Sequence, residues 1–197
     1  QAAATIRIVQ TAMAEDEDYR DFRKLALIGE YWNDGDWRGY YVHTFERLLP
    51  RETYFESHPE YFSLVNGQRI PYGQLCLSHP DVLKITIDQL RSEMAAHPSI
   101  RYWSVSQNDN FEHCQCAKCR AIDSLEGSPA GLMLRFVNEV ARAFPDKVIT
   151  TLAYQYTRTP PRITKPEKNV MITLCTIELD RCHPIETNPA GASFVRD

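Results

Sequence analysis

Apolar residues are spaced as in β-strands over five stretches of the chain. Thr5 to Thr11 alternates apolar and polar residues, which predicts a strand with one buried face. Tyr40 to Phe45 predicts a second strand. Arg101 to Ser106, Lys147 to Tyr154 and Asn169 to Ile177 are rich in apolar, β-branched and aromatic residues, as in strands buried on both faces. We therefore expect about five parallel strands.

Three stretches with helical spacing lie between these strands. Tyr19 to Gly29 predicts a short helix. Ser78 to His97 begins with a capping serine and has Pro80 in its first turn, and Ser128 to Phe144 carries an apolar stripe along one face. Asn66-Gly67 stands between two short β-prone runs and predicts a hairpin outside the main sheet.

Strands that alternate with amphipathic helices predict an α/β fold whose parallel sheet is covered on both faces. The chain has 197 residues, whereas a complete (β/α)8 TIM barrel takes about 250. We expect residues 1–197 to form a single domain of the TIM-barrel type. It would be a partial barrel of about five parallel strands with flanking helices, the central part of a larger barrel domain.

Composition narrows the class of partner. A formal net charge of −4 with interspersed signs gives no broad basic surface for a nucleic-acid backbone, so we expect no nucleic acid partner. No apolar run approaches the ~18 residues of a membrane span. Gln1 to Ala4 lacks the basic region and apolar core of a signal peptide, so we expect a soluble chain whose signal peptide is already absent. Protein partners stay unknown.

Half of the six cysteines lie close together in sequence and favour a metal site over a disulfide framework. Three thiolates suit zinc, with a fourth ligand from His113, Cys182 or His183. The candidate set is Cys114, Cys116, Cys119 and His183. One disulfide plus free thiols is the alternative in an extracellular protein. An iron–sulfur centre is not expected, because a fourth nearby cysteine is missing from the sequence.

Several phrases of the sequence together resemble the DUF4838 family. They are Val42-His43-Thr44-Phe45, His58-Pro59-Glu60-Tyr61-Phe62, Gln74-Leu75-Cys76-Leu77, Ser104 to Asn110, Cys114-x-Cys116-x-x-Cys119, Phe136-Val137-Asn138 and Leu152-Ala153-Tyr154. The resemblance extends from about Tyr40 to His183. It implies a bacterial secreted protein grouped with barrel-fold glycoside hydrolases of the α-glucuronidase and β-hexosaminidase types, and hence a carbohydrate substrate.

Glycoside hydrolysis takes two carboxyl groups, an acid that protonates the leaving oxygen and a nucleophile or base. Asp109 follows one predicted strand and Glu178 ends another, and barrel active sites lie at the carboxyl ends of strands. Asp109 is therefore the candidate acid and Glu178 the second carboxylate. The alternatives are a loop cap for Asp109 and, for Glu178, an ion pair with Arg181 or Arg158.

Polar and aromatic residues near the other strand ends are candidate sugar contacts. They are Asn108, His43, Tyr154, Tyr156 and Trp37. The sequence thus favours a glycosidase acting on an oligosaccharide or polysaccharide, with no cofactor required for catalysis and zinc in a structural role. A non-catalytic carbohydrate-binding protein on the same scaffold is the alternative, and a zinc-dependent hydrolase ranks last because three thiolates are typical of closed sites.

Overall fold

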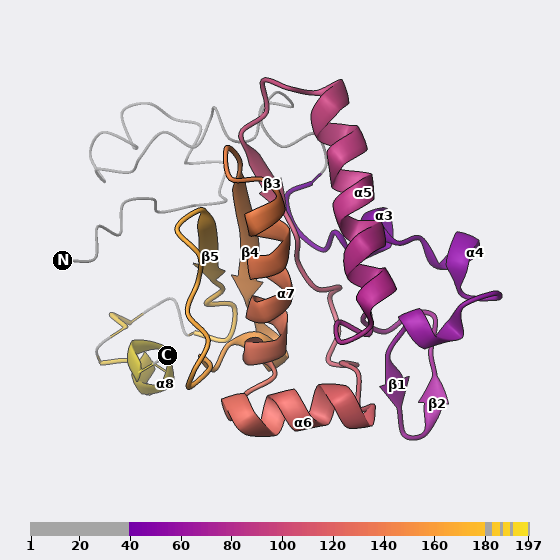
Figure 1. Ribbon diagram of the computed structural model, residues 1–197. Helices are drawn as coiled ribbons and strands as arrows, with labels where there is room; N and C mark the ends of the chain where they lie inside the picture. Colours follow the sequence, from indigo (N-terminus) through magenta and orange to yellow (C-terminus); the bar gives the residue numbers. More distant parts are fainter. Residues whose placement is uncertain (1–39, 180–182, 186, 190, 197) are drawn as a thin grey trace.

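The computed structural model describes residues 40–179, 183–185, 187–189 and 191–196 (Figure 1). The predicted strand at Thr5 to Thr11, the predicted helix at Tyr19 to Gly29 and the predicted sugar contact Trp37 lie outside these residues. In the described part of the chain, no helix combines the length and the apolar character that a membrane crossing takes.

A parallel sheet of three strands organises the molecule. Its order is β3 (Tyr102–Ser104), β4 (Val148–Ala153) and β5 (Val170–Leu174), so neighbours in the sequence are neighbours in the sheet. Trp103, Ile149 and Val170 lie in one row across the three strands. The mixed α/β fold and the parallel pairing of these three predicted strands are therefore confirmed. Closure into a barrel and five parallel strands stay predictions.

Two long helices bury the apolar face of this sheet. Helix α7 (Ala130–Ala143) contacts both β4 and helix α5 (Pro80–Ala96), which lies beside it in Figure 1. The core between them contains the fully buried Trp103 and Ile149. Helix α5 begins one residue later than the sequence suggests, because the side chain of His79, and not that of Ser78, accepts a hydrogen bond from the backbone N–H of Asp81.

The predicted strand at Tyr40 to Phe45 is wrong as a regular strand. Its backbone does lie along β3, because the carbonyl of Tyr40 accepts from the N–H of Ser104 at 3.1 Å and the N–H of Thr44 donates to the carbonyl of Ser106 at 3.1 Å. His43 interrupts the extended conformation between these two bonds, with φ of 54°. Helix α3 (Phe45–Leu48) then begins at once, followed by α4 (Arg51–Tyr54) and the 3-10 helix η2 (Pro59–Tyr61).

The predicted hairpin is confirmed. Strands β1 (Leu64–Val65) and β2 (Gln68–Arg69) pair in antiparallel fashion around Asn66 and Gly67. Both turn residues have positive φ, 51° and 82°, as a two-residue type I′ turn requires. The chain then passes through Gln74 to Leu77, where Leu75 forms an isolated antiparallel bridge with Phe62.

Helix α6 (Ala117–Glu126) follows the cysteine-rich segment and was not predicted. It ends at Gly127, which has a left-handed conformation with φ of 74°. The helix packs against α7 and lies at the bottom of Figure 1, the side toward which β4 points. The carboxyl ends of the strands and the loops that follow them therefore face this side of the molecule.

The connection from β4 to β5 contains the 3-10 helix η3 (Gln155–Thr157) and a proline-rich loop in place of an α-helix. Ile172 and Leu174 on β5 consequently stay 43% and 39% exposed. They line an apolar cavity of about 170 Å³ together with residues of α7 such as Met133. Helix α8 (Gly191–Arg196) is the last described element.

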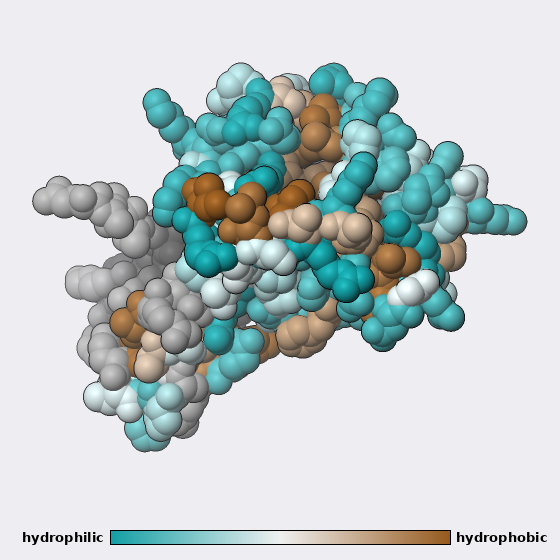
Figure 2. All heavy atoms as spheres, turned by 60° about the horizontal axis from the view of Figure 1, so that its bottom comes forward, coloured by the Kyte–Doolittle hydropathy of each residue, from teal (hydrophilic) through white to brown (hydrophobic). Residues whose placement is uncertain are grey.

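Figure 2 turns the bottom of Figure 1 toward the reader. This face is largely hydrophilic, with hydrophobic groups gathered near its centre.

Candidate functional site

Asp109 and Tyr154 meet where two neighbouring strands end. Asp109 lies in the loop after β3, and Tyr154 directly follows β4. The hydroxyl of Tyr154 donates to Oδ1 of Asp109 at 2.9 Å, and Nε2 of Gln155 donates to the same oxygen at 3.0 Å. The carboxyl group is exposed and fixed by both bonds. The carboxyl ends of parallel strands are where ligands bind in α/β folds.

The hydrogen bond between the two residues also affects the phenol. Burial raises the pKa of Tyr154, and the adjacent Asp109 carboxylate raises it further. Tyr154 therefore stays protonated over the physiological range and acts as a hydrogen-bond donor to Asp109.

Two residues that bind the loop carrying Asp109 have backbone conformations that side chains rarely adopt. His43 has φ of 54° and Gln155 has φ of 51°. A non-glycine residue in this region costs about 1–2 kcal/mol, so the surrounding contacts must hold it there. Such residues concentrate at functional sites, and here Gln155 donates to Asp109 itself while His43 donates to the carbonyl of Gln107 in the same loop.

His43 is placed by the backbone of the β3 loop. Its Nδ1 donates to the carbonyl of Gln107 at 2.8 Å, because a carbonyl oxygen only accepts. This bond leaves Nε2 as the acceptor of the neutral ring. The rings of His43 and Tyr154 lie with their centroids 6.1 Å apart. The structure thus brings together three of the residues that the sequence suggested: Asp109, His43 and Tyr154.

The buried side chain of Gln107 connects the end of β3 to η3. Its Nε2 donates to Oγ1 of Thr157 at 2.6 Å and to the carbonyl of Tyr154 at 3.1 Å. Because Gln107 directly precedes Asn108 and Asp109, these bonds position the carboxylate relative to Tyr154. Gln107 was not singled out by sequence reasoning.

Asn108 is bound within the protein. Its Nδ2 donates to the carbonyl of Gly73 at 2.8 Å. Its backbone N–H donates to Oε1 of Gln74, and its carbonyl accepts from Nε2 of Gln74, both at 2.9 Å. The same Nε2 reaches the carbonyl of Asn110 at 2.9 Å. Gln74 thereby holds the loop on both sides of Asp109.

The other predicted site residues lie apart from this group. Tyr156 stacks on His113 with ring centroids 4.9 Å apart, and both line a small cavity with Asp123 and Cys114. Burial raises the pKa of Tyr156 and of Asp123. Glu178 is exposed in the turn after β5. Their roles, like that of Asp109, stay predictions.

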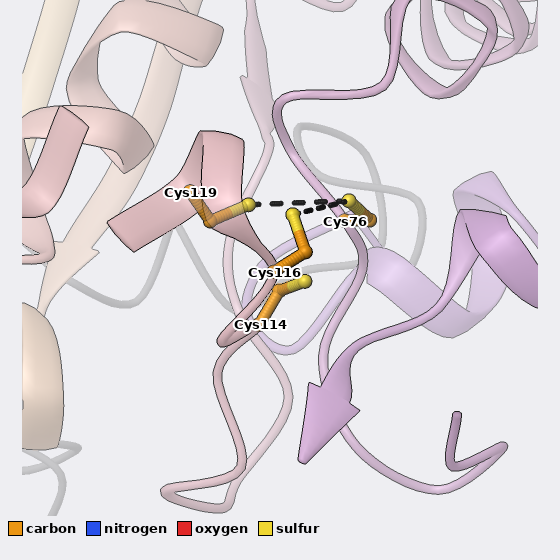
Figure 3. A group of neighbouring side chains, drawn as sticks. All are labelled: Cys76, Cys114, Cys116 and Cys119. Atoms are coloured by element: carbon orange, nitrogen blue, oxygen red, sulfur yellow. Dashed lines mark hydrogen bonds between the residues drawn. The ribbon is translucent and has the colours of Figure 1, made fainter. Parts of the chain in front are cut away.

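Four cysteines converge beside the Asp109 loop (Figure 3). They are Cys76, Cys114, Cys116 and Cys119, whose sulfur atoms all lie within 4.8 Å of one another. Cys76 comes from the segment before α5, Cys114 and Cys116 from the loop after Asp109, and Cys119 from the first turn of α6. Such a group is able to hold a metal ion.

The predicted ligand set changes in one position. His183 is described by the structure but is not a member of the group, and Cys76 takes the fourth place instead. Cys182, another candidate for that place, lies outside the described residues. The expectation that a fourth nearby cysteine is missing was wrong, because Cys76 is distant in the sequence and adjacent in the fold.

The four thiols influence one another strongly. Hydrogen bonds from Cys114 and Cys119 hold the pKa of the Cys76 thiol well below its usual range, against the effect of burial. Bonds to Cys114 and Cys76, together with burial, raise the pKa of Cys119. The hydrogen bonds thus favour the thiolate at Cys76 and the neutral thiol at Cys119.

Comparison with known proteins gives two results besides the family. No curated protein matches the chain. Among solved structures, the chain is similar to the GH36 α-galactosidase AgaA from Geobacillus stearothermophilus in complex with 1-deoxygalactonojirimycin. The identity is 18% and the TM-score 0.33, and the similar region covers 50% of this chain and 14% of that chain.

The family is established by a model that matches the whole chain. It is the family described as a domain of unknown function, DUF4838, and the match covers residues 1–197. This protein therefore belongs to the DUF4838 family.

Proposed function

We propose that the chain forms part of a glycoside-hydrolase-like domain that binds an oligosaccharide or polysaccharide and cleaves it with paired carboxyl groups. The observation that carries this proposal is the fixed, exposed carboxyl group of Asp109 at the carboxyl end of β3. It receives hydrogen bonds from Tyr154 and Gln155, which follow the adjacent parallel strand.

In this proposal Asp109 is the general acid. Its carboxyl group gives a proton to the leaving glycosidic oxygen, and negative charge develops on the carboxylate as the bond breaks. The hydroxyl of Tyr154 and the amide of Gln155 already point at Oδ1. They stabilise that charge without having to reorient, which is how preorganised donors accelerate a reaction.

Glu178 is the proposed second carboxylate. It follows β5, and β4 separates β5 from the strand that precedes Asp109. The two carboxyl groups would flank the scissile bond, with Glu178 as the nucleophile or as the base that activates water.

Sugar contacts come from the side chains around Asp109. Nδ1 of His43 makes the bond to Gln107, so Nε2 of the same ring can accept a hydrogen bond from a sugar hydroxyl. The ring of Tyr154 offers an apolar face to the sugar. Asn108 contributes its side-chain oxygen, since its Nδ2 is used by Gly73. Tyr156 and Trp37 are proposed as further contacts with more distant parts of the ligand.

The proposal also covers the domain, the location of the protein, the metal and the cofactor. Residues 1–197 would form one domain within a larger barrel of a secreted, periplasmic or cell-surface bacterial protein. A zinc ion at the cysteine group would be structural, because four thiolates leave no open position for water or substrate. The carboxyl groups would do the chemistry without a cofactor.

The test is turnover of a broad glycan panel by the wild type, followed by Asp109→Asn on any substrate found. Loss of a general acid lowers kcat by about 100-fold or more. Asp146→Asn is the matched control, because Asp146 is exposed in the turn between α7 and β4. Full turnover by Asp109→Asn would refute the assignment. Proton NMR of the first product anomer distinguishes inversion from retention.

A non-catalytic carbohydrate-binding protein is the second candidate. It is favoured by the exposure of Asp109, because an exposed carboxylate beside two rings suits a sugar hydroxyl as well as it suits a scissile bond. Calorimetry on the same panel decides: binding that depends on Asp109, without turnover in any arm, supports this candidate over the hydrolase.

A further inference from the structure

We propose that Cys76, Cys114, Cys116 and Cys119 together bind one zinc ion in a closed tetrahedral site, and that this ion fixes the loop that carries Asp109. The metal site does not rest on the proposed function. It would exist in a hydrolase and in a binding protein alike, because its ligands lie outside the Asp109 group.

The distances between the sulfur atoms fit a single ion. Zinc–sulfur bonds of about 2.3 Å in a tetrahedron place the sulfur atoms about 3.8 Å apart. Sγ of Cys76 lies 3.8 Å from that of Cys116 and 3.9 Å from that of Cys119. A disulfide needs about 2.05 Å, and the four cysteines are free thiols in this structure.

An iron–sulfur cluster fits less well. Its thiolates bind different iron atoms, so they surround a core of several atoms rather than one ion. Here all four ligand atoms lie within 4.8 Å of one another. In Figure 3 the side chains point toward a common centre from two sides, Cys76 from one segment and the other three from the loop and α6.

Polar groups around the sulfur atoms are those that a thiolate site needs. The backbone N–H of Leu64, in the hairpin, donates to Sγ of Cys114 at 3.4 Å. Oγ of Ser78 lies 3.1 Å from Sγ of Cys119. The guanidinium of Arg69 lies 3.8 Å from Sγ of Cys114 and offsets part of the excess negative charge of four thiolates on a divalent ion. Such surrounding donors orient ligands and tune a bound metal.

The site is largely shielded from solvent. Cys76, Cys114 and Cys119 are buried, Cys116 is half-buried, and Leu132 of α7 packs with them. Leu64, Leu77 and Ile122 cover the group further. Four sulfur ligands in such surroundings are typical of structural zinc, where binding free energy contributes directly to folding.

The ion would fix the Asp109 loop at both ends. Cys76 lies two residues after Gln74, whose amide holds Asn108 and Asn110. Cys114 lies four residues after Asn110. Zinc between Cys76 and Cys114 therefore clamps the segment that carries Gln74 against the far end of the loop. Without the ion, this segment and the loop would be held together by the hydrogen bonds of Gln74 and by those from Asn108 to Gly73 and from Asn110 to Tyr72.

The first experiment measures metal content in protein purified without a chelator. We expect about one zinc per chain in the wild type and a loss of at least five-fold in Cys76→Ser. Cys175→Ser, a free cysteine after β5, and His183→Ala should keep the wild-type content. Zinc loss in His183→Ala with retention in Cys76→Ser would overturn the ligand set.

A second measurement covers the case in which Cys76→Ser does not fold. Cobalt(II) added to the metal-free wild type should give the visible and near-ultraviolet bands of tetrahedral thiolate coordination, and zinc should abolish them. Intact mass with thiol labelling reports the oxidation state of the same sample. A metal-free protein with a disulfide between any two of the four cysteines would refute the zinc site, and iron in place of zinc would refute the choice of metal.

The effect on the loop has its own readout. Hydrogen exchange of residues 108–113 should become faster when zinc is removed, and readdition of zinc should restore the slow rate. Residues of β4, distant from the four cysteines along the chain, serve as the internal control. Faster exchange confined to residues 114–126 would mean that the ion stabilises only α6, and would refute the link to Asp109 while leaving the metal site intact.

Discussion

Two carboxylates that lie in different parts of the molecule are both held by hydrogen bonds, yet their surroundings differ. Glu126, the last residue of α6, is 0% exposed. It accepts bonds from Arg135, from the side chain and N–H of Thr164, and from the N–H of Ile163. Asp109 is exposed and accepts two bonds at one oxygen. A saturated buried carboxylate serves the fold, whereas an exposed one with fixed orientation is available to a ligand.

The backbone conformation near Glu126 is relaxed, whereas that near Asp109 is strained. Gly127, directly after Glu126, has φ of 74°, and glycine adopts this conformation without strain. At the candidate site the positive φ values belong to His43 and Gln155, for which they cost free energy. The chain thus uses the relaxed residue at the structural carboxylate and strained residues at the candidate site.

The largest effect is expected from Glu126→Gln. The substitution removes the charge that Arg135 and the loop at Ile163 and Thr164 require, so the free energy of unfolding should fall by about 3 kcal/mol. Urea denaturation measures it. Glu139→Gln on α7 is the control, because its ion pair with Arg142 is exposed and should contribute about 0.5 kcal/mol. Equal losses in the free energy of unfolding for the two variants would contradict the distinction between a buried structural carboxylate and an exposed one.

Low pH should reproduce part of the loss in the free energy of unfolding that is expected for Glu126→Gln. Burial raises the pKa of Glu126, but hydrogen bonds from Thr164, Arg135 and Ile163 outweigh it and lower the pKa to about 2. The folded state therefore binds this proton less readily than the unfolded chain, whose value is 4.5. The contribution is complete above pH 4.5 and disappears as the pH falls toward 2. Stability of Glu126→Gln, followed by the same denaturation, should decline less over this interval.

A smaller effect is expected from Tyr154→Phe, this time on binding. The variant loses the hydroxyl that orients Asp109, and a hydrogen bond to a charged group contributes about 1.5 kcal/mol, or roughly ten-fold in Kd. Its stability should stay within about 0.5 kcal/mol of the wild type. Calorimetry with the glycan found in the panel measures binding, and Tyr54→Phe on α4 is the control. Unchanged affinity in Tyr154→Phe would contradict the proposal that an oriented Asp109 carboxylate binds the ligand.

The smallest effect should have the opposite sign. Gln155→Gly relieves a positive φ that costs about 1–2 kcal/mol, while the flexibility of glycine in the unfolded chain offsets about 0.5–1 kcal/mol. Thermal unfolding should show a slight gain in stability together with weaker binding, because the donor to Asp109 is lost. Asn66→Gly in the hairpin turn, which also has positive φ, should leave binding unchanged. A loss of stability in Gln155→Gly would show that the conformation is not strained.

The elements that the sequence predicted well are those that depend on local pattern. The apolar runs that became β3, β4 and β5 and the Asn66-Gly67 turn are examples, and strand-end position alone was enough to group Asp109 with Tyr154. Helix α6 was missed because its exposed face is polar and because it begins within the cysteine-rich segment, with Cys119 in its first turn.

What the sequence could not provide depends on long-range contact. Cys76 meets Cys116 across 40 positions, and nothing near Cys76 in the sequence indicates the partner. Gln107 and Gln155 look like ordinary polar residues until their amides are seen to reach Thr157 and Asp109. The positive φ of His43 cannot be recognised from the residue type. This backbone conformation is the reason that the regular strand predicted at Tyr40 to Phe45 does not form.

The side chain of Gln74 acts as a substitute for a neighbouring strand. Its amide oxygen and nitrogen pair with the N–H and carbonyl of Asn108, as a peptide group would in a sheet, while its own N–H reaches the carbonyl of Glu112. A loop held in this way has little conformational entropy left to lose when a ligand arrives. If a ligand binds at Asp109 as proposed, the surface around this residue is already formed before the encounter, and association should proceed in one step without a closing motion.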